Sequence, residues 1–311
     1  MNAQRTFTEE VKHQFYYGGM TVKLIFINLL VFLFVGLVSV LGGLMQGEFK
    51  SFIKEFNTTV FALDTNISEA IVKPWGLITS IFAHFSFMHL LLNMLMLYFV
   101  GKAFEQLFNQ KRLLYTYILG GLLGGIFEIL AHTFFPIFAH ETKTVIVGAS
   151  GSVMAIFMAL AFYRPSTEVS LFGIFPVKLI YLACIYLAMN LLSLAKPDGT
   201  AHFAHIGGAF LGILSIQKIN SSNNIISLFE RLIESIKNLF TRSTRKKKPT
   251  FTIHKGGSAR GGVKTDEEFN FDKKQRQEKI DAILDKIAKS GYESLSKAEK
   301  EFLFKQSQDG K

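Results

Sequence analysis

Long apolar segments alternate with short polar ones through the first two thirds of the chain. Six apolar segments stand out, at about residues 21–44, 86–108, 113–135, 150–163, 177–194 and 203–219. Runs of about 20 apolar residues match the roughly 30 Å hydrocarbon core of a bilayer. The pattern therefore predicts an all-α polytopic membrane protein, a bundle of six transmembrane helices.

The fourth apolar segment, residues 150–163, is shorter than the others. A helix of that length does not cross a full bilayer unaided, so Ser150 is expected to lie below the membrane surface. A helix can begin inside a membrane only where water or protein satisfies its free N–H groups.

Between the first two apolar segments lies a more polar stretch that includes Lys50, Lys54, Asp64 and Trp75. It is too polar to span and too apolar to be a plain linker. We expect it to lie at the membrane interface, with Trp75 as an anchor. Ser86 is placed to cap the second spanning helix.

The composition changes after the sixth segment. We divide the chain into an N-terminal cytoplasmic segment (1–20), a six-helix membrane domain (21–220), an amphipathic helix with a basic run (221–248), a flexible linker (249–272) and a small helical C-terminal appendage (273–311). The amphipathic helix is expected to rest on the membrane, held by attraction between its basic run and anionic lipid. In the appendage, Ser296 and Glu299 have the spacing of a capping box.

The overall composition agrees with a membrane protein, and the distribution of its basic residues predicts its orientation. The chain is 49% hydrophobic, contains 32 phenylalanines and carries a formal net charge of +10. In a six-span arrangement most basic residues fall on one side, which predicts that both termini are cytoplasmic. We attribute the positive net charge to lysines and arginines in cytoplasmic loops rather than to nucleic-acid binding. We therefore expect no nucleic-acid partner. The single cysteine, Cys184, can form no intramolecular disulfide.

A few polar residues stand on these apolar segments and are candidates for chemistry. His89 and Asn93 are four residues apart and so share one helical face. Ser150 begins the short fourth segment, and His205 lies near the start of the sixth. Polar side chains are costly at membrane depth, and hydrolysis needs a nucleophile activated by a base, which serine and histidine could supply.

Glycines accompany the serine and the histidine. Gly148 and Gly151 flank Ser150, while Gly208 and Gly212 follow His205 at four-residue spacing. Glycines on that face would let the sixth helix approach the fourth closely enough for a hydrogen bond between the two side chains.

Taken together, residues 89–93 (HLLLN), 148–151 (GASG) and 204–212 (AHIGGAFLG) resemble the rhomboid family of intramembrane serine proteases. The resemblance covers about residues 20–220 and includes the order of the motifs on spans two, four and six. It implies that Ser150 is the nucleophile, that His205 is its general base, and that His89 and Asn93 stabilise the oxyanion together with the Ser150 backbone N–H.

The same resemblance implies an endopeptidase that cleaves transmembrane segments of other membrane proteins, prefers small residues at the cleaved bond and admits its substrate past the fifth span. It also implies an integral membrane protein of the bacterial inner membrane. We expect no cofactor and no metal. The C-terminal tail could contact a cytoplasmic partner, and the alternative function is a catalytically silent rhomboid-like protein that binds membrane proteins without cutting them.

The chain departs from the family pattern in places. Met154 stands four residues after the serine, where many relatives carry an aromatic ring that stacks on the base histidine. Trp75 is followed by Gly76 rather than by the arginine common in the family. No carboxylate is evident to orient His205, and Glu128, in the third span, is expected to make a structural hydrogen bond instead.

Overall fold

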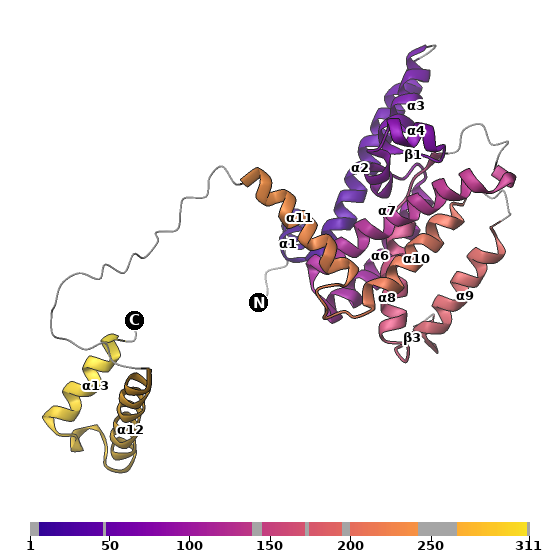
Figure 1. Cartoon of the computed structure of the whole chain (residues 1–311). Coiled ribbons are helices and arrows are strands. Elements are labelled where there is room, and N and C mark those ends of the chain that lie inside the picture. Colours follow the sequence, from indigo (N-terminus) through magenta and orange to yellow (C-terminus); the bar gives the residue numbers. More distant parts are fainter. Residues whose placement is uncertain are drawn as a thin grey trace, which may run out of the picture. The chain divides into compact units, whose positions relative to one another are not determined.

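The computed structural model describes residues 6–45, 48–138, 145–171, 174–194, 200–241 and 266–309 (Figure 1). The chain divides into two compact units, residues 1–245 and 246–311. Helices dominate both units, and each unit is described by itself.

The first unit begins with α1 (Phe7–Tyr17), for which no helix was predicted, and α2 (Gly19–Leu44), which agrees with the predicted first span to within two residues. Glu105, far along the chain, holds the start of α2. Its carboxylate accepts hydrogen bonds from the backbone N–H groups of Met20 and Thr21 and from the Thr21 hydroxyl. A carboxylate at a helix N-terminus satisfies free N–H groups and complements the positive end of the helix dipole.

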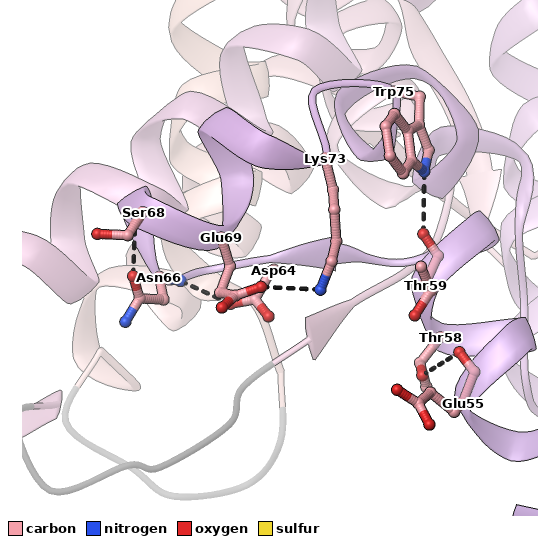
Figure 2. Close-up of polar contacts among 9 residues, drawn as sticks. All are labelled: Glu55, Thr58, Thr59, Asp64, Asn66, Ser68, Glu69, Lys73 and Trp75. Atoms are coloured by element: carbon pink, nitrogen blue, oxygen red, sulfur yellow. Dashed lines mark hydrogen bonds and ion pairs between the residues drawn. The ribbon is translucent and has the colours of Figure 1, made fainter. Parts of the chain in front are cut away.

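The predicted interfacial stretch folds into short elements: α3 (Glu48–Phe61), β1 (Leu63–Asp64), α4 (Ile67–Val72), α5 (Gly76–Thr79) and the 3₁₀ turn η1 (Ser80–Phe82). Figure 2 shows the polar contacts that fix their connections. The Trp75 indole N–H donates to the carbonyl oxygen of Thr59 at 2.9 Å, while 45% of this residue remains exposed. Lys73 forms an ion pair with Glu69 at 2.8 Å, and this carboxylate raises the pKa of Lys73.

Two long helices follow, α6 (Phe87–Leu107) and α7 (Gln110–Phe134). Both agree with the predicted second and third spans to within three residues. Ser86 does occupy the N-cap position of α6, but its side chain makes no capping hydrogen bond there. The predicted N-cap position of Ser86 is therefore confirmed, without a hydrogen bond from its side chain.

Helix α8 (Ser150–Tyr163) has the predicted bounds and forms the centre of the first unit. Every residue from Gly151 to Ala161 is buried, as expected for a helix that is apolar on all sides. Helices α7 and α10 (His202–Ile216) pack against it closely. Helix α9 (Leu179–Leu192) lies at the side of this core (Figure 1) and leaves most of its surface exposed.

Three of the described helices, α2, α6 and α7, are long and apolar enough to cross a membrane. Helices α8, α9 and α10 are apolar but have 14, 14 and 15 residues. At 1.5 Å per residue a helix of this length reaches only about 21 Å. The predicted fifth segment is shortened because residues 175–178 form strand β4 (Phe175–Lys178), which pairs with β3 (Glu168–Leu171).

The all-α prediction therefore needs a correction. Besides the β3–β4 hairpin, β1 pairs antiparallel with β2 (Val145–Ile146), close to the start of α8. These strands have two to four residues each, too few to produce a periodic pattern in the sequence. The remaining short element of this region is η2 (Pro136–Phe138).

The amphipathic helix is α11 (Ile225–Thr241), and it contacts the start of α7. Lys111 forms ion pairs with Glu230 and Glu234, and the rings of Tyr115 and Phe229 meet edge to face at 5.4 Å. The predicted basic run at 242–248 lies outside the described residues.

The second unit contains α12 (Asp266–Ser290), the turn η4 (Tyr292–Ser294) and α13 (Lys297–Asp309). The capping box is present, with the Ser296 N–H donating to Glu299 at 2.7 Å and the Glu299 N–H directed to the Ser296 hydroxyl at 3.4 Å. The Ser296 N–H and the Lys286 ammonium lower the pKa of Glu299 to about 2. Residues 266–272 are helical rather than linker, because α12 begins earlier than predicted; 249–265 lie outside the described residues.

Candidate active site

Ser150 is the first residue of α8, and the two residues before it are held by neighbouring segments. The Gly148 N–H donates to the carbonyl oxygen of Ser80 at 2.9 Å, and the Ala149 N–H donates to His84 Nε2 at 3.3 Å. Gly148 has a φ of +130°, a conformation that side-chain-bearing residues rarely adopt. This geometry turns the chain sharply into α8, so that the helix begins at Ser150.

His205 lies in the first turn of α10, and the start of that helix is fixed by Glu128 of α7. The Ala204 N–H donates to Glu128 Oε2 at 2.9 Å. His132, one turn further along α7, lies 3.6 Å from the other carboxylate oxygen. The expected structural hydrogen bond of Glu128 is confirmed, and this bond places the helix that carries His205.

Helices α8 and α10 approach each other backbone to backbone. A Cβ atom on Gly208 would collide with the carbonyl oxygen of Gly151, and one on Gly212 would collide with that of Ala155. A Cβ on Gly151 would lie 3.2 Å from the carbonyl oxygen of Ala204. The residues next to Ser150 and His205 are therefore in direct contact, as the glycine spacing predicts.

His89, on α6, lies close to the start of α8, and Asn93 follows it one turn later on the same helix. A Cβ atom on Gly148 would come within 2.8 Å of His89 Nε2, so this imidazole lies against the turn that precedes Ser150. The Asn93 amide donates to the His89 carbonyl oxygen at 2.9 Å. His84 meets His89 edge to face at 5.0 Å between ring centres.

Asn190, which the sequence analysis did not single out, contacts the histidines of α10. Its Oδ1 atom lies 2.6 Å from His205 Nδ1 and 3.1 Å from His202 Nδ1. The signal was present in the sequence, since Asn190 is the lone amide in an otherwise apolar segment.

The aromatic ring beside His205 also comes from an unexpected helix. Met154 is 2% exposed and belongs to the hydrophobic core around α8. Tyr186 of α9 instead lies beside the His205 imidazole, with ring centres 6.1 Å apart and planes inclined by 32°. The side of the imidazole is therefore covered by α9.

Comparison with known proteins agrees with this arrangement. The family model of the Rhomboid domain matches residues 72–219. Rhomboid protease AarA of Providencia stuartii is 25% identical over 226 residues, which are 68% of this chain and 76% of the relative. Putative rhomboid protease YdcA of Bacillus subtilis is 27% identical over 154 residues, 49% of this chain and 73% of the relative.

RHOMBOID-like protein 12, mitochondrial, of Arabidopsis thaliana is 28% identical over 153 residues, 46% of each chain. The matched part of the chain spans less than half the length of this plant relative and of two others, at 46%, 44% and 40%. A second model, a family of unknown function (DUF6576), matches residues 264–309. The chain is an integral membrane protein, and its residues 72–219 match the Rhomboid domain.

Proposed function

We propose that this protein is an intramembrane serine endopeptidase that cleaves transmembrane segments of other membrane proteins with Ser150 and His205. The observation that carries the proposal is the glycine-mediated contact between the start of α8 and the first turns of α10. This contact brings the backbone beside a serine against the backbone beside a histidine, deep in an apolar bundle.

In the proposed reaction, the proton of Ser150 Oγ moves to His205 Nε2 as the oxygen attacks the substrate carbonyl carbon. The tetrahedral intermediate then expels the amine, which takes the proton from His205, and an acyl-enzyme remains. His205 next accepts a proton from a water molecule that attacks the ester. The second tetrahedral intermediate then breaks its bond to Ser150 Oγ, which takes the proton back from His205. The second product leaves as a carboxylic acid, and both side chains return to their starting state.

The oxyanion of the intermediate is proposed to bind at the start of α8. Ser150 is the first residue of this helix, so its backbone N–H has no partner within the helix. His89 lies against Gly148, and Asn93 uses one amide hydrogen on the His89 carbonyl, which leaves a second for the oxyanion. Donors aimed at a developing charge act most strongly where water is restricted.

The length of α8 supports a site at membrane depth. We propose that this site opens to water from the non-cytoplasmic side. Fourteen residues cover only part of the bilayer, so Ser150 begins below the surface. We propose that the substrate enters past α9, and that helix-destabilising segments with small residues are cut.

We further propose that α2, α6, α7, α8, α9 and α10 together form the six-helix membrane domain, with both termini in the cytoplasm of a bacterial cell. The inner membrane is the proposed location. In this arrangement α11 rests on the cytoplasmic leaflet, and the α12–α13 unit is a cytoplasmic appendage that meets a partner there.

A fluorophosphonate probe tests the proposal without a substrate. The purified full-length protein in detergent should be labelled on one residue, Ser150, and Ser150→Ala and His205→Ala should both lose the label. Peptide mass spectrometry locates the modification. Ser152→Ala is the matched control, since this nearby hydroxyl is fully buried and has no hydrogen-bond partner among the described residues.

Labelling that persists in Ser150→Ala would exclude this serine as the nucleophile. A wild-type protein that is neither labelled nor cleaves any transmembrane substrate would favour the catalytically silent alternative.

A further inference from the structure

Asn190 is one of two buried residues on α9, and it faces the core. The other is Ala183, seven residues earlier and so on the same helical face. Asn190 is 4% exposed, whereas Met189 beside it is 61% exposed. Burying an amide is unfavourable unless its polar atoms are hydrogen-bonded, so its partners explain why it faces inward.

Hydrogen bonds on both sides fix the orientation of the Asn190 amide. Its Nδ2 atom donates to the Tyr186 carbonyl oxygen at 2.9 Å, one turn earlier on α9. The Oδ1 atom must then face the histidines, and it can only accept. His205 Nδ1 lies 2.6 Å from this oxygen and is therefore the donor, which requires that Nδ1 carry a hydrogen.

The position of that hydrogen decides what the other ring nitrogen can do. A neutral imidazole protonated on Nδ1 has a lone pair on Nε2, the form that a general base needs. His202 Nδ1 lies farther from the same oxygen, at 3.1 Å. A carbonyl oxygen has two lone pairs, so both histidines can donate to it, with His205 making the shorter contact.

We propose that Asn190 is a positioning residue that holds His205 in its Nδ1-protonated tautomer, with Tyr186 covering the side of the ring. The inference rests on the proposed function and gives the base of that function a hydrogen-bond partner on α9. It also ties the base to α9, because the orienting atom and the covering ring both belong to that helix.

A tether that only fastens α9 to the core would explain the same hydrogen bonds, so the test must separate the two roles. The variants are Asn190→Leu, which fills the space without an acceptor, and Asn190→Asp, which keeps an acceptor. Met189→Leu is the matched control on the exposed side of α9. Thermal unfolding and cleavage of a reporter with one transmembrane segment are measured for each.

For Asn190→Leu we expect kcat to fall by about 10- to 100-fold with KM nearly unchanged, less than the ~10⁴-fold loss when a triad aspartate becomes an amide. Asn190→Asp should recover most of this loss, and Met189→Leu should equal the wild type. A tether alone predicts a lower unfolding temperature with kcat preserved in the folded fraction, and that result would overturn the proposal.

A second readout does not depend on turnover. Nitrogen NMR of ring-labelled histidine distinguishes the two neutral tautomers, and the His205 signal is assigned by its loss in His205→Ala. The wild type should show Nδ1–H, and Asn190→Leu should show a mixture. If the tautomer of His205 is unchanged in Asn190→Leu, the positioning role of Asn190 is refuted even if the enzyme is active. If the wild type shows the expected tautomer but is inactive, only the proposed protease function is refuted.

Discussion

Ser150→Ala and His205→Ala are each expected to lower cleavage of a transmembrane reporter by at least about 10³-fold, because nucleophile and base act in the same step. The double variant should be no less active than either single variant, since each removes the whole function of the pair. The measurement is initial cleavage rate in proteoliposomes at equal amounts of folded protein.

Ser152→Ala provides the matched control for this pair. Its hydroxyl lies two residues along α8, is fully buried and lacks a partner among the described residues, so its removal should leave the rate unchanged. Additive losses in the double variant would show that the serine and the histidine do not work together. Wild-type rates in either single variant would remove the assignment altogether.

Gly208→Val is expected to lower the rate by about 100-fold or more, since a displacement of about 1 Å in a catalytic group can cost that much. The new Cβ would meet the Gly151 carbonyl oxygen, a backbone atom that cannot rotate aside. Helices α8 and α10 must then separate, and the overpacking should destabilise the protein by about 1–3 kcal/mol. Cleavage rate and thermal unfolding are the two measurements.

Gly36→Val is the control for this substitution, because a Cβ on this glycine of α2 meets no described atom within 4 Å. It should insert, fold and cleave like the wild type. The cleavage rate of Gly208→Ala should lie between those of the wild type and Gly208→Val. Alanine adds the colliding Cβ atom but not the two methyl groups that valine carries on it. Full turnover in Gly208→Val would show that the close contact of the two helices is not needed for activity.

How far the sequence could predict the fold depended on the length of each apolar run. The bounds of α2, α6 and α7 follow from long apolar runs, and α8 has the predicted limits because Gly148 and Arg164 bracket a short one. Helix α9 begins at Leu179 rather than at 177, since 177–178 belong to strand β4, and α10 ends at Ile216 rather than at 219, since the backbone becomes extended at Gln217. Strands β1 and β2 pair across 80 residues of chain, and no local pattern reveals such a contact.

The candidate site likewise has residues that local sequence patterns predict and contacts that only helix packing determines. Ser150, His205, His89 and Asn93 could be selected because each is a polar residue at a fixed spacing on an apolar segment, and the glycines showed where two helices could approach. The sequence shows Asn190 as a lone amide on its apolar segment, but it does not reveal that Asn190 contacts His205 or that Glu128 contacts Ala204. Both hydrogen bonds join residues of different helices.

By itself, the sequence determined that this is a membrane protein of apolar helices with a serine and a histidine on two of them, because hydrophobic runs and motif spacing are local properties. Only the tertiary structure decided what surrounds the histidine. Asn190 and Tyr186 reach it from α9, and Met154 turns into the core instead, since these outcomes depend on how the helices rotate and pack against one another.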